Sequence, residues 1–486
     1  MSELNKKVIN ATMWSSFSEI SSKLIAPITT MVLARLLTPE VFGVVATVTM
    51  IISFTQLFSD AGFQRYLIQY EFENDDDKYK TTNVAFLSNL VISLLLWAVI
   101  IFFRESLAKV VGNPGLGNVI AIACVSIPIA AFSSIQMALY KRSFDFKTLF
   151  YTRIIGVLIP LLITIPLAFY LKNYWALIIG TIIVHTSNAI ILTIKSKWKP
   201  NWYYSIKRLK KMLSFSSWVL FDSILVWATS YIDIFIIGVT LNEYYLGIYK
   251  TSITTVGQIT GIITATIIPI ILPALSRLQN DKEKLREMVL KLQKITSIIL
   301  IPLGVGIFMF SDLVTQILLG DQWFEASDFI GIWGLMSAIT IIFSRFSTVI
   351  YPAVGKPRMS VVAQLSHLIV LIPVIIFAAD YGFETLFWAR SLVRFELILV
   401  NLIITYYLVA LSPWKMVRNI APELIVSVFM GMVALALQQI HNSILWSFMS
   451  IGICITIYFL ILSLFPKEKQ IMLKLLNQIY KKIERK

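Results

Sequence analysis

Long apolar runs recur along the whole 486-residue chain and are separated by short polar stretches. Each run has roughly 18 to 25 residues, enough for an α-helix to cross the hydrocarbon core of a bilayer. Membrane β-strands alternate apolar and polar residues, whereas runs such as 261–272 do not. The pattern therefore predicts an all-α integral membrane protein with about 14 transmembrane helices, at roughly 14–37, 42–59, 83–103, 118–139, 150–171, 174–194, 212–238, 246–272, 295–318, 329–354, 361–379, 385–409, 422–440 and 444–465.

The amino-acid composition excludes a soluble enzyme. Of all residues, 57% are hydrophobic and 14% are charged, whereas soluble domains have roughly 45–50% apolar and about 25% charged residues. Cys124 and Cys454 lie in apolar runs far apart in the sequence, so neither a disulfide framework nor a metal site is expected. The first apolar run is too long and too charged for a signal peptide, and we interpret it as a retained helix.

The distribution of charge predicts how the chain is oriented in the membrane. The formal net charge is +15, and lysine and arginine concentrate in alternate loops and both tails, with seven in residues 195–211 and seven in 467–486. Because cytoplasmic loops are enriched in these residues, both termini are predicted to be cytoplasmic. This topology and attraction to anionic membrane lipids explain the charge without nucleic acid as a partner.

The chain also resembles itself at a constant offset of 204 residues, which pairs Trp14 with Trp218 and Gly43 with Gly247. Six predicted spans separate the members of each pair. Because six is even, the two units would share one orientation, as in transporters built from parallel repeats. Chance matches among similar apolar segments are the alternative.

These observations divide the chain into five predicted parts. In residues 195–211 Pro200 breaks the helix, and the tryptophans and tyrosines of this segment are expected at the level of the lipid headgroups. Residues 277–294 and the tail have apolar positions at helical spacing beneath charges, which indicates interfacial helices; a frayed end is the alternative for the tail. The parts are an N-terminal six-helix bundle (1–194), a cytoplasmic linker (195–211), a C-terminal six-helix bundle (212–409), two additional transmembrane helices (410–465) and a basic amphipathic cytoplasmic tail (466–486).

Ionisable residues within the apolar runs are the candidate functional residues. A charged group near the centre of a transmembrane helix costs about 2.5–3.5 kcal/mol on insertion scales, so such groups usually face a bundle interior or an aqueous cavity. Seven basic residues against four acidic ones favour an anionic passenger. The candidates for substrate binding are Lys23, Arg345, Arg35, Arg153, Lys250 and Arg390, and those for ion coupling are Asp222, Asp233 and Glu19.

Several basic candidates have a purely structural alternative. Arg153, Lys250 and Arg390 lie near the ends of spans, where snorkelling to the headgroups would explain them. Lys23 lies four residues after Glu19 in one predicted helix, so the two could simply neutralise one another.

The acidic pair Asp222 and Asp233 shares one helix face, about 16 Å apart along the axis. Two carboxylates facing a cavity suit proton or cation handling, and hydrogen bonds between packed helices are the alternative. His185 and His367 also lie in spans and are interpreted as hydrogen-bonded packing residues.

Catalytic motifs are missing from the sequence, which contains no Walker A loop, no HExxH and no GxSxG. ATP-driven pumping by this chain is therefore excluded. The predicted external loops, of at most about fifteen residues, leave no room for an external catalytic domain. We expect a protein that is not an enzyme and needs no cofactor.

Short segments that are specific as a set carry a family resemblance. They are 34–43 (ARLLTPEVFG), 60–63 (DAGF), 67–69 (LIQ), 138–146 (ALYKRSFDF), 232–238, 246–249, 273–279 (PALSRLQ) and 320–323 (GDQW). In this order they resemble the polysaccharide transporter family of the multidrug/oligosaccharidyl-lipid/polysaccharide exporter superfamily, most of all the colanic acid and teichuronic acid exporters. The likeness covers roughly residues 1–410.

The resemblance implies a flippase of the bacterial cytoplasmic (inner) membrane. It would move undecaprenyl-diphosphate-linked oligosaccharide repeat units to the outer leaflet for O-antigen or exopolysaccharide assembly, with a polysaccharide polymerase and glycosyltransferases as candidate partners. It also implies two six-helix bundles in a V shape that alternate between inward and outward openings. A cation-coupled multidrug exporter of the same superfamily is one alternative, and a membrane glycan polymerase or acyltransferase is a less favoured one.

Overall fold

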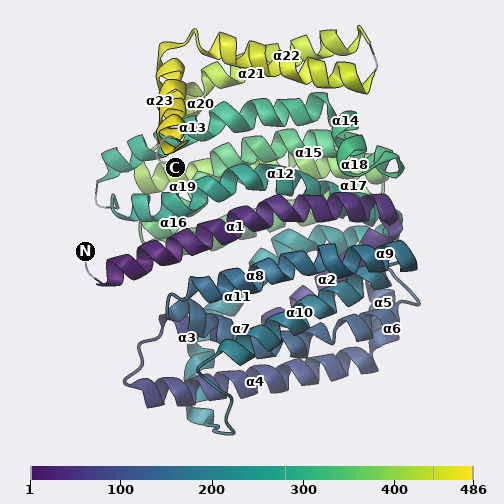
Figure 1. Cartoon of the computed structure of the whole chain (residues 1–486), viewed down its shortest axis with the longest axis vertical. Helices are drawn as coiled ribbons and strands as arrows, with labels where there is room; N and C mark the ends of the chain where they lie inside the picture. The colour runs from purple at the N-terminus through teal and green to yellow at the C-terminus, as the bar shows by residue number, and fades with distance from the viewer. Residues whose placement is uncertain (1–2, 280, 442, 484–486) are drawn as a thin grey trace. The chain divides into compact units, whose positions relative to one another are not determined.

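The computed structural model describes residues 3–279, 281–441 and 443–483. Every regular element within these residues is a helix, as the apolar runs predict (Figure 1). The helices form two compact units. Unit 1 comprises Met1–Thr254, Thr264–Pro269 and His367–Leu386, and unit 2 comprises Thr255–Ile263, Ile270–Ser366 and Phe387–Lys486.

Unit 1 consists mainly of the helices of the N-terminal half. Its largest helix contacts are those of α7 with α10 and α4, and of α1 with α8. The short helix α3 packs against α7 and α11. The helices are α1 (Glu3–Leu36), α2 (Pro39–Asp60), α3 (Phe63–Gln69), α4 (Asp75–Phe102), α5 (Arg104–Val110), α6 (Gly117–Ala123), α7 (Ser126–Arg142), α8 (Phe146–Ile159), the π-helical turn η1 (Pro160–Thr164), α9 (Ile165–Leu171), α10 (Trp175–Lys195), α11 (Ile206–Thr240) and the first part of α12 (Glu243–Ser276).

Unit 2 is organised around α13, which packs against α15 and α21, while α21 packs against α22. Figure 1 shows the last helix, α23, turned across the ends of α21 and α22. The helices α12, α17 (Arg358–Ala379) and α18 (Phe383–Leu392) are shared between the units. The others are α13 (Lys282–Met309), α14 (Ser311–Leu318), the 3-10 helix η2 (Asp321–Ala326), α15 (Ser327–Thr340), the π-helical turn η3 (Ile341–Arg345), α16 (Phe346–Ala353), α19 (Arg394–Val409), α20 (Pro413–Asn419), α21 (Ala421–Gln438), α22 (Ile444–Leu462) and α23 (Pro466–Ile483).

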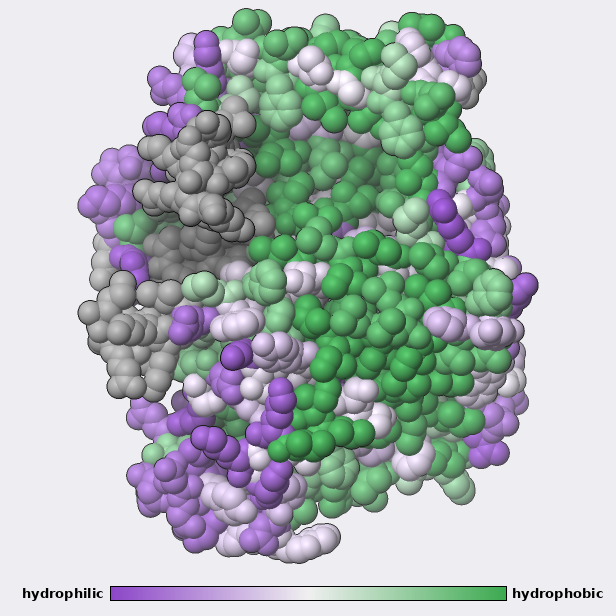
Figure 2. Space-filling model, in the orientation of Figure 1, coloured by the Kyte–Doolittle hydropathy of each residue, from purple (hydrophilic) through white to green (hydrophobic). Residues whose placement is uncertain are grey.

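Twelve helical stretches of the described residues are long and apolar enough to cross a membrane. On the face that Figure 2 shows, the surface over the middles of the helices is largely hydrophobic, and hydrophilic residues gather towards the helix ends. The predicted spans 14–37 and 246–272 lie on α1 and α12, which are not among the twelve. A total of fourteen therefore stays a prediction.

Residues 277–294 do not form the separate interfacial helix that their pattern indicates. Helix α13 begins at Lys282 and continues without a break to Met309, so the amphipathic segment is the first half of a long helix. Asp281 caps this helix by accepting a hydrogen bond from the Lys284 backbone N–H at 3.1 Å, which holds the pKa of its carboxyl below the usual range. Lys294, the last charge of the segment, is buried against the Glu423 carboxylate, so this end of the segment packs inside the protein.

Candidate functional site

The packing of α1 on α8 brings two of the predicted site residues together. The Glu19 carboxylate forms an ion pair with the Arg153 guanidinium at 2.7 Å. Lys23, one turn further along α1, is half-buried and has no ion-pair partner among the described residues. Glu19 is therefore neutralised by Arg153 and not by Lys23, because α8 supplies a partner that the sequence of α1 alone does not reveal.

The two aspartates of α11 have different surroundings. Asp222 is partly exposed, and its carboxylate lies 3.6 Å from the Arg65 guanidinium. Asp233 is buried, and its Oδ2 accepts a hydrogen bond of 2.6 Å from the Tyr249 hydroxyl of α12. Lys250, the neighbour of Tyr249, lies with its ammonium 5.1 Å from the centre of the Tyr231 ring. Asp233 thus makes the helix-packing hydrogen bond that was one of the two interpretations of the pair.

The cations of unit 2 divide into a packed pair and an exposed one. Arg390 and Arg394 lie 5.2 and 3.4 Å from the centre of the Trp333 ring, and Arg394 also donates to Ser337 Oγ at 2.7 Å. Cation–π contacts of this kind stabilise by about 0.5–2 kcal/mol. Arg345, by contrast, ends the π-helical turn η3 and is exposed. Such turns are frequent at functional sites.

Arg35, a basic candidate of unit 1, is exposed in the last turn of α1.

A polar cavity of about 380 Å³ within unit 1 is the main feature that the sequence reasoning missed. Its polar residues come from six helices, four of them from α2 and one or two from each of the others, so no linear motif marks them. The only available signal was the hydroxyl and amide side chains within apolar runs. The polar lining consists of Ser53, Gln56, Ser59, Asp60, Gln64, Arg65, Asn89, Ser133, Ser134, His185, Asn188 and Ser223.

Some polar groups of this cavity are paired and others are not. Asn89 Nδ2 donates to Ser134 Oγ at 2.7 Å, and the Trp227 indole N–H donates to Ser53 Oγ at 3.0 Å. The Oδ1 atoms of Asp60 and Asn188 are shielded from solvent and accept no hydrogen bond from the described part of the chain. The wall of the cavity therefore contains two hydrogen-bond acceptors, Asp60 Oδ1 and Asn188 Oδ1, that have no donor among the described residues.

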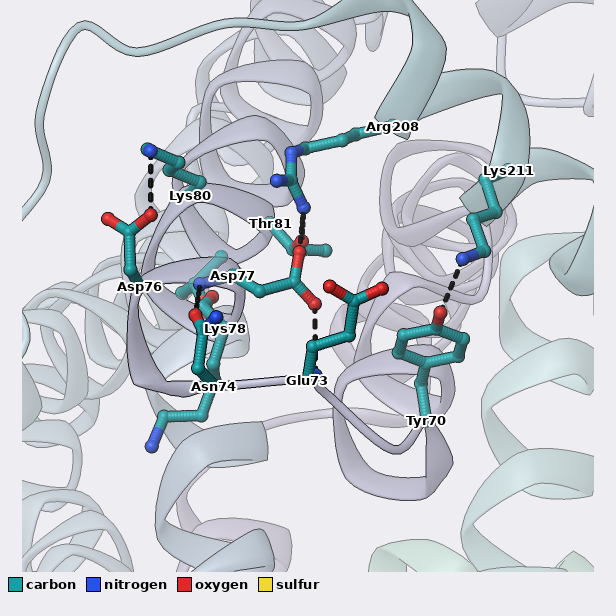
Figure 3. Close-up of polar contacts among 11 residues, drawn as sticks. Tyr70, Glu73, Asn74, Asp76, Asp77, Lys78, Lys80, Thr81, Arg208 and Lys211 are labelled. Carbon is teal, nitrogen blue, oxygen red and sulfur yellow. Dashed lines mark hydrogen bonds and ion pairs between the residues drawn. The ribbon is translucent and has the colours of Figure 1, made fainter.

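The linker 195–211 is held against unit 1 by polar contacts (Figure 3). Arg208 pairs with Asp77 of α4 and donates to Thr81 Oγ1 at 2.8 Å, and Lys211 binds the Tyr70 hydroxyl. Acidic residues just before and within the first turn of α4 thus face a basic linker, which no hydrophobic pattern indicates.

The linker tryptophans lie in different environments. Trp198 is buried in the core of unit 1 with its ring 5.5 Å from that of Phe86, whereas Trp202 is 90% exposed. The expectation of headgroup-level aromatic residues is therefore wrong for Trp198, because the linker folds back onto the bundle.

The comparisons with known proteins agree with the sequence resemblance. A family model described as "Polysaccharide biosynthesis protein" matches residues 32–328. The succinoglycan biosynthesis transport protein ExoT of Rhizobium meliloti (strain 1021) is 22% identical over 71% of this chain and 69% of its own length. The teichuronic acid biosynthesis protein TuaB of Bacillus subtilis (strain 168) is 20% identical over 89% of both chains.

Among solved structures, the lipid II flippase MurJ in an inward closed conformation is similar in fold. The TM-score is 0.74 with 16% sequence identity, over 94% of this chain and 99% of that chain. At this identity the likeness concerns the fold alone. Together the family match and the fold confirm the resemblance that the short segments indicate.

Proposed function

Because the chain belongs to the polysaccharide biosynthesis protein family, we propose that it is a flippase for undecaprenyl-diphosphate-linked oligosaccharide repeat units. It is a multi-pass protein of the bacterial inner membrane. The cargo would move from the inner to the outer leaflet. Glycosyltransferases would act before the transfer and a polymerase after it. The polysaccharide names of the relatives ExoT and TuaB support this cargo class.

The observation that carries the proposal is the unequal pairing of charges in the spans. All three acidic candidates are engaged by neighbouring side chains. Lys23 and Arg345, in contrast, have no ion-pair partner within the described residues. An uncompensated cation in an apolar span attracts an anion. A diphosphate is such an anion, and we assign Lys23 and Arg345 to its binding or to acidic sugars.

The transport step follows from the chemistry of the cargo. A diphosphate and its sugars cannot cross hydrocarbon unaided, because each charged or hydroxyl group would lose its hydrogen bonds to water. The polyprenyl tail needs no such shelter and stays in lipid. We propose that the basic side chains offer a wet route for the head group while the protein alternates between inward and outward openings.

Alternating access would rest on two parallel repeats, and a reciprocal contact in unit 1 supports them. Helices α2 and α12 begin at Pro39 and Glu243, which are 204 residues apart. A Cβ atom at Gly43 would overlap the carbonyl oxygen of Glu243, and one at Gly247 would overlap that of Pro39. Equivalent residues thus make equivalent contacts, as in a two-fold related pair. We propose that the two repeats have the same orientation in the membrane and that both termini are cytoplasmic, as the loop charges predict.

Replacing the two unpaired cations tests the proposal in cells. Lys23→Ala and Arg345→Ala should leave the amount of membrane protein unchanged and lower surface polysaccharide at least about tenfold, since each loses an anion contact of about 1.5–3 kcal/mol. Arg345→Lys should keep part of the activity because it keeps the charge. The exposed Lys356, outside the spans, provides the control Lys356→Ala.

Normal amounts of surface polysaccharide in both alanine variants would contradict the assignment of Lys23 and Arg345 to cargo binding. Resistance of a drug-sensitive host to cationic drugs, with unchanged surface polysaccharide, would favour the multidrug exporter over the flippase.

A further inference from the structure

The polar cavity of unit 1 has the size of a small-molecule site. Its volume of about 380 Å³ lies at the lower end of the roughly 300–1,000 Å³ typical of such sites. That space suits a sugar ring and excludes a whole lipid-linked repeat unit. The walls come from α2, α3, α4, α7, α10 and α11, so the cavity is built by the packed bundle and not by a single loop.

Two shielded acceptors give the cavity a need for hydrogen-bond donors. Asp60 Oδ1 and Asn188 Oδ1 line it and have no partner among the described residues. A buried acceptor left without a donor destabilises the folded protein, because it has lost its hydrogen bonds to water. An occupant that carries several hydroxyl groups would supply donors to both, and it would also meet the serine hydroxyls of α2 and α7.

The charges of the cavity select against a phosphate. Asp60 contributes a carboxylate, and the guanidinium of Arg65 is already directed to Asp222 at 3.6 Å. The remaining polar groups of the lining are neutral hydroxyls and amides and one histidine. A diphosphate would therefore face the carboxyl group of Asp60 and would have to compete with Asp222 for Arg65, the cation of the lining, whereas a neutral sugar needs no counter-charge.

The apolar part of the lining suits the other face of a sugar. Leu57, Ile127, Val219 and Leu220 line the cavity together with the polar groups. A pyranose ring has C–H groups as well as hydroxyls, and mixed walls with a few placed polar groups are typical of small-molecule sites. From size, unused acceptors and charge, we infer that this cavity is a subsite for one neutral sugar residue of the glycan, an inference that rests on the proposed function.

Binding of free sugars to the full chain in lipid nanodiscs tests the subsite directly. The probes are methyl α-glucopyranoside, methyl α-galactopyranoside, methyl α-mannopyranoside and N-acetylglucosamine, measured by saturation-transfer NMR. At least one should give a signal with the native protein. Asn188→Leu, which replaces an acceptor by an apolar group of similar size, should reduce that signal at least about fivefold.

Thr186→Val is the matched control. Thr186 lies on the same helix, its hydroxyl donates to the Ile182 carbonyl at 2.8 Å, and it does not line the cavity. Its signal should equal that of the native protein. If Asn188→Leu fails to fold, Asp60→Leu, which removes the other unpaired acceptor, replaces it, with the same loss expected.

The outcomes separate the subsite from the proposed function. Equal signals from native and cavity variants, or no signal from any of the four sugars, would overturn the subsite. If the native protein flips a lipid-linked oligosaccharide in liposomes but binds no sugar in the cavity, only the inferred subsite is contradicted. If the native protein flips no such lipid, the proposed function is contradicted, whatever the NMR signals show.

Discussion

Two groups of buried polar side chains, one in each unit, differ in whether a charged partner from the protein itself lies at their centre. In unit 2 the Lys294 ammonium is within 2.9 Å of a Glu423 carboxylate oxygen, 2.5 Å of one from Glu468 and 2.7 Å of the Asn419 carbonyl oxygen. In the cavity of unit 1 the acceptors of Asp60 and Asn188 remain without a donor among the described residues.

The difference separates a structural role from a binding role. The three hydrogens of an ammonium match the three acceptors around Lys294, and this Lys294 cluster ties α23 and α21 to α13. All three donors of the Lys294 ammonium are thus used within the protein, and of the carboxylate oxygens around it Glu423 Oε1 accepts no hydrogen bond from the described residues. The cavity of unit 1 leaves hydrogen-bonding capacity unused, at a cost to stability that an occupant would repay.

The largest effect is expected from breaking the Lys294 cluster. Lys294→Met leaves two carboxylates in a site where Glu423 is 0% and Glu468 4% exposed. Removing one partner of a buried ion pair costs about 3–5 kcal/mol, so we expect a strongly lowered unfolding temperature in detergent and little protein in the membrane. Lys291→Met, an exposed lysine one turn earlier on α13, is the control. Native stability of Lys294→Met would show that the cluster is not structural.

A smaller effect of opposite sign is expected in the cavity. Asn188→Leu removes a shielded acceptor that has no donor, and it should raise the free energy of unfolding by about 1 kcal/mol while transport falls. Thermal unfolding and transport measured on the same preparation check both. Lower stability together with lower transport would indicate that Asn188 serves packing, as Lys294 does.

A still smaller effect is expected where an ion pair lies at the bundle end. Arg208 and Asp77, which join the linker to α4, are partly exposed. Because such pairs contribute about 0.2–1 kcal/mol and are screened by salt, Asp77→Asn should lower the unfolding temperature slightly at low salt and hardly at high salt. An effect as large as that of Lys294→Met, or one independent of salt, would contradict this assignment.

The least effect on stability is expected from Asp222→Asn, since Asp222 and Arg65 are only partly buried and 3.6 Å apart. Its effect should lie in energy coupling. Flipping by the native protein should respond to an imposed pH or Na⁺ gradient, and the response should shrink in Asp222→Asn. Asp233→Asn, whose oxygen can still accept from Tyr249, should keep it. Identical responses in all three proteins would remove the coupling role of Asp222.

The helical class of the molecule could be predicted because it depends on one property, the length of apolar runs. The family could be predicted because short segments such as 34–43 and 138–146 keep their order along the chain. The partners of charged residues could not. Glu19 pairs with Arg153 of another helix and Lys294 with Glu423 and Glu468, and such contacts depend on helix rotation and packing, which hydropathy does not encode.

The cavity escaped prediction for a related reason. A serine, glutamine or asparagine within an apolar run costs too little to stand out as a charged residue does. Residues such as Gln56, Asn89 and Asn188 lie on three different helices and gain meaning only when packing brings them to one wall. The charged candidates stand out singly, but their roles stay proposals because their partners come from elsewhere in the chain.

The most direct test of the flippase is transport by the purified protein in liposomes. A fluorescent undecaprenyl-diphosphate-linked oligosaccharide is placed in both leaflets, and the fraction accessible to an external glycan-modifying reagent is followed over time. The native protein should make nearly all of the lipid accessible within the assay, whereas protein-free liposomes and those with Arg345→Ala should stop near one half. Accessibility that stops near one half with the native protein as well, despite correct folding, would contradict the proposed function.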